Sequence, residues 1–202
     1  MLYYENKLRR EGYDFIIGID EVGRGCLAGP VVAAAVLLKE TRFRSRIDDS
    51  KRLTPLQREA AFPEIVDKSA FGVGIVSEKA IDRLNIAVAT GIAMEKAVSM
   101  LLKGLGPCNE KRICLMVDGT VKLKTHLPYI NIIRGDSKSK SIACASILAK
   151  VTRDSIMSSY DVVYPQYGFW KHKGYPTRLH RVAVERFGLS RIHRVSFCHA
   201  AK

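Results

Sequence analysis

The sequence predicts an α/β protein in which one mixed β-sheet is covered by helices. Two observations predict it: short apolar runs that suit strands, and longer amphipathic stretches between them that suit helices. The chain has 202 residues, of which 47% are hydrophobic, without an internal repeat or a low-complexity linker. We therefore expect one domain over 1–202 that ends in a short basic segment.

The first half of the chain contains three expected strands. They are runs of branched or small apolar residues, at 15–19, 30–38 and 71–76. Between the second and the third, residues 55–68 have a helical pattern. Thr54 is a favourable N-cap and Pro55 suits a first helical position, so we expect a helix to begin there.

The second half adds two strands and two long helices. Residues 82–102 are amphipathic and predict one continuous helix. The runs at 113–117 and 129–133 are too short for helices and are expected to be strands. From Ser137 a wide apolar face predicts a buried helix that ends near Tyr160.

The charge balance points to a polyanionic partner. Lys and Arg number 33 against 20 Asp and Glu, which gives a formal net charge of +13. The longest nearly apolar stretch, 26–38, is shorter than the roughly 20 residues of a membrane helix. Charged residues are scattered through the first 14 positions, where a secretory signal needs an apolar core. We therefore expect a cytoplasmic protein without a membrane partner.

The cysteines and histidines do not form a recognisable metal motif. Five cysteines without a CxxC pair are expected to be buried, reduced thiols: Cys26, Cys108, Cys114, Cys144 and Cys198. Four histidines fall in the last 31 residues without an HxxxH pair: His172, His180, His193 and His199. In so basic a segment we expect them to be polar surface groups or phosphate contacts rather than metal ligands.

Four acidic residues stand at the ends of apolar runs. Asp20 and Glu21 follow the first expected strand, Asp118 ends the fourth, and Asp136 lies just after the fifth. Strand ends that point the same way form the ligand crevice of an open α/β sheet, so these carboxylates are expected to converge. Hard oxygen ligands suit Mg²⁺ or Mn²⁺, which would bridge them to phosphate oxygens.

Each of these residues also has a structural interpretation when taken alone. The acids suit a solvated strand end, a turn or a helix N-cap, and only their combination favours metal-dependent phosphate chemistry. The turn at 23–28 fits the GxGxxA dinucleotide fingerprint, but a strand rather than a helix follows it. Without Cβ atoms, Gly23 and Gly25 suit close approach of the main chain to a ligand such as a sugar.

Basic residues concentrate in two stretches, which we expect to form a phosphate track. Residues 39–58 hold seven Lys or Arg, and residues 171–202 hold eight. Solvated surface is the alternative for any one of them. Lys51 is the basic residue most expected to lie near a phosphate.

Seven blocks of the sequence closely resemble bacterial ribonuclease HII. They are GIDEVGRGCLAGPVVAAAV (18–36), DSKRLT (49–54), NIAVATGIAM (85–94), MVDG (116–119), GDSKSKSIACASILAKVTRD (135–154), YPQYGFWKHKGYPT (164–177) and IHRVSF (192–197). The resemblance implies a ribonuclease H-like fold with a five-stranded mixed sheet flanked by helices. It also implies an endonuclease that hydrolyses the RNA strand of RNA/DNA hybrids and cleaves 5′ of single ribonucleotides in duplex DNA, leaving 3′-hydroxyl and 5′-phosphate ends.

The resemblance also assigns roles to individual residues. The family's metal-binding carboxylates fall on the same four acids, which would hold two divalent cations, Mg²⁺ or Mn²⁺. Its sugar-binding turn falls on Gly23, Arg24 and Gly25, and its substrate-sensing tyrosine on Tyr175. We expect a monomer. The alternative is a catalytically inactive hybrid-binding protein on the same fold, whose signature, loss of a carboxylate, is not seen here.

Overall fold

The computed structural model describes residues 1–107 and 109–198, with a five-stranded sheet at its centre. The strands are β1 (Phe15–Val22), β2 (Val31–Leu38), β3 (Ser69–Val76), β4 (Ile113–Asp118) and β5 (Tyr129–Ile132). They lie in the order β3-β2-β1-β4-β5. β2 is antiparallel to both β1 and β3, whereas β4 is parallel to β1 and β5. The predicted mixed sheet is confirmed.

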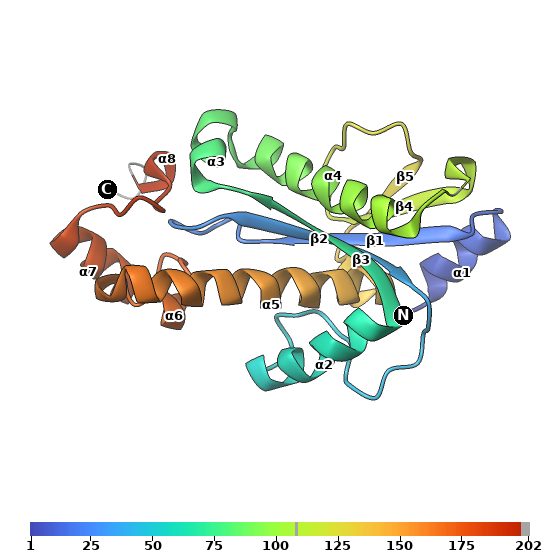
Figure 1. Ribbon diagram of the computed structural model, residues 1–202, viewed down its shortest axis with the longest axis horizontal. Helices are drawn as coiled ribbons and strands as arrows, with labels where there is room; N and C mark the ends of the chain where they lie inside the picture. The colour runs from blue at the N-terminus through green and yellow to red at the C-terminus, as the bar shows by residue number, and fades with distance from the viewer. Residues whose placement is uncertain (108, 199–202) are drawn as a thin grey trace.

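Helices cover both faces of this sheet (Figure 1). The α-helices are α1 (Tyr3–Arg10), α2 (Pro55–Lys68), α3 (Glu78–Leu84), α4 (Ile86–Leu105), α5 (Lys140–Val163), α6 (Phe169–His172), α7 (Arg178–Phe187) and α8 (Val195–Cys198). The short 3₁₀ helices are η1 (Glu110–Arg112), η2 (Gly135–Ser137) and η3 (Pro165–Tyr167). α4 lies on one face, and α5 and α2 lie on the other.

The alternation of side chains along β1 and β4 decides which residues meet α5. Ile17 and Ile19 belong to the core under α4, whereas Ile16 packs on the α5 side with Cys114 and Met116. Successive side chains on a strand point to opposite faces. Even-numbered residues at the ends of both strands therefore project toward α5, and odd-numbered ones toward α4.

α2 begins and ends where the sequence predicts. The Thr54 hydroxyl accepts a hydrogen bond from the Gln57 N–H, and the Gln57 side chain accepts one from the Thr54 N–H. This reciprocal pair satisfies two backbone donors that the first turn of a helix otherwise leaves free. The helix then runs to Lys68, as its pattern predicts.

The single helix predicted over 82–102 is wrong. The structure has two helices, α3 and α4, because Asn85 adopts a left-handed φ of 68° that a continuous helix does not allow. The Asn85 side chain accepts a hydrogen bond from the Val88 N–H and so begins α4. A short polar residue that tolerates this φ thus ends one helix and starts the next.

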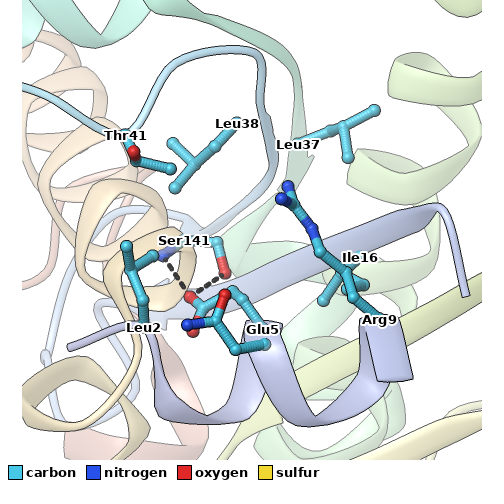
Figure 2. Close-up of a pocket in the computed structure, with 9 residues that line it drawn as sticks. Leu2, Glu5, Arg9, Ile16, Leu37, Leu38, Thr41 and Ser141 are labelled. Atoms are coloured by element: carbon cyan, nitrogen blue, oxygen red, sulfur yellow. Dashed lines mark hydrogen bonds between the residues drawn. The ribbon is translucent and has the colours of Figure 1, made fainter. Parts of the chain in front are cut away.

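α5 is buried along most of its first half and packs directly on β1. A Cβ atom at Gly18 would lie 2.4 Å from the Ile142 nitrogen, so only glycine permits this approach. Ser139 caps the helix, and Glu5 of α1 reinforces its start (Figure 2). One oxygen of the buried Glu5 carboxylate accepts hydrogen bonds from the Ser141 N–H and hydroxyl, which suits an anion at a helix N-terminus.

The segment after α5, residues 164–198, packs against that helix. Phe169 and Ile192 are buried against Ala28 and Met157, in a small core of their own. Among the described cysteines, Cys26, Cys114 and Cys144 are buried without a disulfide, as predicted, and Cys198 is half-buried. Cys108 and His199 lie outside the described residues. No helix within 1–107 or 109–198 is long and apolar enough to span a membrane.

Candidate active site

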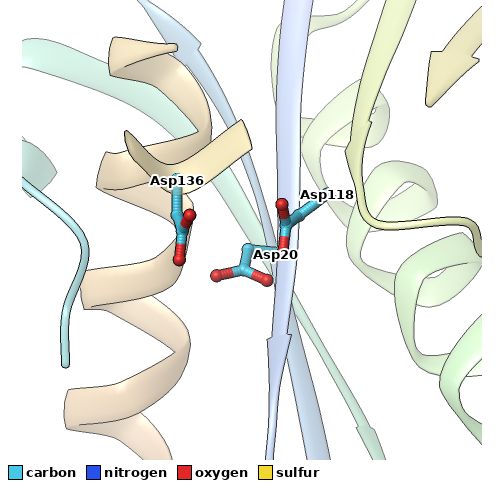
Figure 3. A group of neighbouring side chains, drawn as sticks. All are labelled: Asp20, Asp118 and Asp136. Atoms are coloured by element: carbon cyan, nitrogen blue, oxygen red, sulfur yellow. The ribbon is translucent and has the colours of Figure 1, made fainter. Parts of the chain in front are cut away.

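Three of the four predicted carboxylates meet between β1 and α5 (Figure 3). Asp20, Asp118 and Asp136 each contribute an oxygen atom, and these atoms all lie within 4.8 Å of one another. Asp20 and Asp136 are buried, and Asp118 is half-buried. The group forms because Asp20 and Asp118 occupy neighbouring even positions of two parallel strands, both of which face α5.

Backbone hydrogen bonds hold two of these carboxylates in place. Asp118 accepts a hydrogen bond of 2.6 Å from the Gly135 N–H, and Gly135 begins the 3₁₀ turn that carries Asp136. Asp20 accepts a bond of 2.7 Å from the N–H of Glu21. The end of β4 is therefore tied directly to the turn of Asp136, which fixes the spacing of the acidic group.

The electrostatics of the group favour a bound cation. Burial, followed by the nearby charges of Glu21 and Asp118, raises the pKa of Asp20 well above its usual range. Burial, then the charge of Asp118, also raises the pKa of Asp136. Carboxylates that raise one another's pKa repel, and a divalent cation with oxygen ligands removes that repulsion. The residues present thus fit Mg²⁺ or Mn²⁺.

Glu21 does not join this group, because successive side chains of β1 alternate in direction and its carboxylate starts away from that of Asp20. Its Oε1 accepts a hydrogen bond of 3.1 Å from Arg24, and its Oε2 is buried without a hydrogen-bond partner among the described residues. Burial raises the pKa of this carboxyl group. Glu21 still lines the same cleft as Asp20, and its buried oxygen without a hydrogen-bond partner fits a metal cation.

A cleft of about 400 Å³ opens beside Asp20. Its lining is Asp20, Glu21, Val22, Ser50, Lys51, Ser146, Lys150 and Tyr175. Lys51 is exposed at its edge, with Nζ 3.8 Å from Asp136 Oδ2. Partial burial works to lower the pKa of Lys51, but the carboxylates of Asp136 and Asp20 outweigh it and raise the pKa. Lys51 therefore stays charged where a phosphate could approach the acidic group.

Sequence reasoning missed three polar residues of this cleft. Ser50 and Ser146 place their hydroxyl oxygens 2.8 Å apart, and Lys150 lies one helical turn beyond Ser146 on α5. The sequence could have indicated Ser146 and Lys150, because a spacing of four residues puts two side chains on one face of a helix. Ser50 was visible only as the neighbour of Lys51.

The ring of Tyr175 packs against α5 and lines the same cleft. Lys150 Nζ lies 5.5 Å and Arg153 Cζ 5.7 Å from the ring centroid. These cation–π contacts orient the half-buried ring. Burial, followed by the neighbouring Cys26, raises the pKa of the phenol to about 12, so it is a neutral hydroxyl at physiological pH.

The expectation that Arg194 belongs to a phosphate track is wrong. Its side chain is fully buried, and its guanidinium donates hydrogen bonds to the carbonyl oxygens of Gly23, Arg24 and Gly29 at 2.7 to 2.9 Å. A guanidinium presents several donors in one plane, which suits three carbonyls at once. Arg194 therefore shapes the glycine turn from inside.

The two glycines of that turn have different reasons to be glycine. Gly23 has a φ of 96°, and a Cβ there would lie 2.2 Å from the side-chain Nε of Arg153. Packing therefore requires Gly23, whereas a Cβ at Gly25 would meet nothing within 4 Å. Among the described residues, no acceptor is present for the N–H groups of Arg24 and Gly25. The space for a ligand lies at Gly25.

The prediction that the histidines are surface groups is wrong for three of them. His172, His180 and His193 are all buried. The His172 and His180 rings stack with centroids 4.3 Å apart. Nε2 of His172 and Nδ1 of His180 hydrogen-bond to the carbonyls of Tyr167 and Tyr175. The three rings pack with Phe169, so they support the segment that carries Tyr175.

Three of the seven basic residues in 39–58 are engaged in local contacts. Arg46 and Arg52 both pair with Asp48, and Arg58 donates to the carbonyl oxygens of Ser50 and Leu53. Exposed ion pairs of this kind contribute little to stability and part readily for another anion. Of the Lys and Arg residues in this stretch, Lys51 is the one that lines the cleft.

Comparison with known proteins gives a consistent result. The family profile described as Ribonuclease HII matches residues 17–200. The ribonuclease HII of Ruminiclostridium cellulolyticum is 47% identical and covers 98% of this chain and 75% of its own. The ribonuclease HII of Geobacillus thermodenitrificans is 50% identical, and the match covers 98% of this chain and 73% of that protein. The fold also matches the crystal structure of ribonuclease H2 from Pyrococcus horikoshii, with a TM-score of 0.70, 24% identity and coverage of 93% and 96%.

Proposed function

The chain belongs to the ribonuclease HII family and is a ribonuclease H, and from that premise we propose which substrates it cuts and how. It hydrolyses the RNA strand of RNA/DNA hybrids and cleaves duplex DNA on the 5′ side of a single ribonucleotide. The products carry 3′-hydroxyl and 5′-phosphate ends. The observation that carries this proposal is the meeting of Asp20, Asp118 and Asp136, with Asp20 three residues before the start of the glycine turn.

The metal ligands are the four carboxylates. Asp20, Asp118 and Asp136 would hold two Mg²⁺ or Mn²⁺ ions together with the unpartnered oxygen of Glu21. Asp20, which lies between the other acids, is the candidate to contact both ions. When bound, two such ions supply an activated water and stabilise the leaving 3′-oxygen.

The protein's own part is to hold these carboxylates and to position the phosphate. The Gly135 N–H keeps Asp118 fixed, so the acidic group does not need to rearrange when a cation binds. Lys51 exchanges its weak contact with Asp136 for a substrate phosphate. Beyond the cleft, the exposed cations of 39–58 and 171–198 give the duplex a positively charged surface.

The ribonucleotide is recognised through its sugar. One 2′-hydroxyl distinguishes it from a deoxyribonucleotide, so contacts to base edges cannot find it. The N–H groups of Arg24 and Gly25 have no acceptor within the described residues, and open space at Gly25 lets a sugar approach them. Arg194 occupies the carbonyls on the inner side of the turn, which leaves the amide donors to the ligand.

Tyr175 reads the nucleotide after the ribonucleotide. Cleavage on the 5′ side places the ribose directly after the scissile phosphate, so the ring meets the next sugar along the strand. A deoxyribose there leaves room for the ring, whereas a ribose presents a further hydroxyl to it. Tyr175 therefore favours the junction from RNA to DNA over continuous RNA.

We further propose that residues 1–202 act as a single domain and as a monomer in the cytoplasm, where ribonucleotides in chromosomal DNA are found. The whole proposal is tested by incubating the protein and Mg²⁺ or Mn²⁺ with duplex DNA that contains one ribonucleotide, and with the same duplex without it. We expect a single cut on the 5′ side of the ribonucleotide in the first duplex only. Cutting of both duplexes, or of neither, refutes the proposed substrate.

A further inference from the structure

A second and larger cleft lies next to the active-site cleft along α5. It measures about 710 Å³ and lies between α2, α5 and the segment around α6. Lys150 lines both clefts, so the two are neighbours on the same side of α5. Ser146 lies in the first and Ser158 in the second, which spans about 18 Å of helix at 1.5 Å per residue. One strand of a duplex rises 3.4 Å per nucleotide, so this distance corresponds to about five nucleotides.

The second cleft has an excess of positive charge. Arg58, Lys150, Lys171 and Lys173 line it, together with two acids, Glu59 and Asp154. Asp154 is already neutralised by Lys150 at 2.9 Å. The balance therefore favours an anion, as the phosphates of a nucleic acid strand would be.

Lys171 is the cation of this cleft that is most available to a ligand. Arg58 and Lys173 donate hydrogen bonds to Ser50 O and to the Ser158 hydroxyl. The exposed ammonium of Lys171 has no polar partner among the described residues and lies 5.3 Å from the Trp170 ring centroid. Its charge can therefore meet a phosphate without breaking an existing bond.

Trp170 adds a large exposed ring at the same place. α6 buries Phe169 and His172 and turns Trp170 outward, with 56% of its surface exposed. The backbone N–H of Trp170 donates a hydrogen bond to Asp161 Oδ1, which fixes the backbone that carries the ring. A fixed aromatic ring beside basic residues is the arrangement that proteins use to stack on nucleic acid strands.

We propose that this cleft binds the DNA flank of the cleaved strand, on the side that follows the ribonucleotide. Lys171 contacts a phosphate and the Trp170 ring packs on a sugar, about five nucleotides from the scissile bond. The choice of this flank rests on the proposed function. There, the sugar that follows the ribonucleotide contacts Tyr175, so the strand runs from the carboxylates past Tyr175 toward this cleft. The flank is recognised by its backbone, so its base sequence has no effect.

The chain contains one tryptophan, so its fluorescence reports on this cleft alone. The Asp118→Asn variant is mixed with duplexes that carry one ribonucleotide and a 3′ flank of either about two or about twelve base pairs, chosen to end before or after the cleft. Binding of each is confirmed by anisotropy of a label on the opposite end. We expect the long flank to shield Trp170 from quenching by acrylamide and the short flank to leave it open.

Variants in the otherwise wild-type enzyme provide the second measurement. We expect Trp170→Ala and Lys171→Ala each to weaken binding of the long-flank duplex about tenfold and to leave the short-flank duplex unchanged. Trp170→Phe retains most of the affinity because it keeps a ring. Lys103→Ala is the matched control, since Lys103 is an exposed lysine of α4 on the opposite face of the sheet.

The outcomes separate this proposal from the proposed function. If cleavage depends on the ribonucleotide but Trp170 stays equally open to acrylamide with both flanks, the cleft proposal is overturned and the proposed function stands. Equal losses of affinity for both flanks in Trp170→Ala also overturn it, because the residue is then structural. If no duplex is cut at its ribonucleotide, the proposed function fails and the flank assignment fails with it.

Discussion

The imidazole rings of His180 and His193 meet inside the protein with their Nε2 atoms 3.0 Å apart. The N–H of Ser190 donates to Nδ1 of His193, so the His193 proton is on Nε2 and is donated to His180. Nδ1 of His180 in turn donates to the Tyr175 carbonyl oxygen at 2.9 Å. This chain of neutral rings ends on the backbone of the residue that lines the active-site cleft.

We expect this histidine pair to make stability depend on pH. Burial lowers the pKa of both rings to about 4, against an ordinary value near 6.5 in the unfolded chain. The unfolded state therefore takes up protons first as pH falls. The stability from these rings is complete above about pH 6.5 and is lost toward pH 4, at roughly 3 kcal/mol for each ring.

Urea unfolding measured across this pH range tests the assignment. His193→Gln should flatten the fall in unfolding free energy, because one titrating group is gone. His126→Gln is the matched control, since His126 is an exposed histidine that pairs with Glu110 at the surface. If both variants keep the wild-type slope, the pair is not the source of the pH dependence.

A second prediction concerns metal removal and does not depend on activity. Without a divalent cation, Asp118→Asn should raise the melting temperature by a few degrees, because it removes one of three clustered charges. Mn²⁺ should raise the melting temperature of the wild type and have little effect on the variant. Thermal unfolding with and without a chelator measures both effects. An equal Mn²⁺ shift in the two proteins would contradict the metal site.

A third prediction concerns Lys51. Binding of the duplex should fall steeply with salt, since each neutralised phosphate releases counterions. Lys51→Ala should reduce the slope of log affinity against log salt by about one, whereas Lys103→Ala should not. Titrations with inactive Asp118→Asn as the background measure these slopes. An unchanged slope in Lys51→Ala would show that Lys51 is only solvated surface.

The fourth prediction separates recognition from packing at Tyr175. Tyr175→Ala should slow cleavage at a single ribonucleotide by one to two orders of magnitude and affect continuous RNA less, because stacking on the deoxyribose is lost. Tyr175→Phe should retain most of the rate, since the ring rather than the hydroxyl makes the contact. The comparison is made on the two substrates side by side. Equal slowing of both, with a lower melting temperature, would assign the ring a structural role.

The fold was predictable where local chemistry is decisive. Thr54 and Pro55 begin α2 at the expected residue because capping and the fixed φ of proline act within one turn. The break at Asn85 was missed because the apolar spacing continues across it, and only its φ of 68° reveals it. Periodicity reports which face is buried and not whether the backbone is continuous.

The acidic group of the site was predictable in part, because side chains alternate regularly along a strand. The meeting of Asp20 with Asp118 follows from equal parity on two parallel strands, and the separation of Glu21 follows from the same rule. Burial of Arg194 and the histidines did not follow from the sequence, because charge counts treat every basic residue as surface. Arg194 donates to the Gly23 carbonyl, far away along the chain, and the histidine rings are buried by packing with Phe169, which no local charge pattern encodes.

The catalytic role of the three aspartates is tested by the cleavage rate of Asp136→Asn and Asp118→Asn on duplex DNA with one ribonucleotide. Both substitutions keep the size of the side chain and remove one charge from the acidic group. We expect cleavage to be nearly abolished at every Mg²⁺ or Mn²⁺ concentration while the duplex still binds. Near-normal turnover in either variant would contradict the assignment of the three aspartates as the catalytic centre.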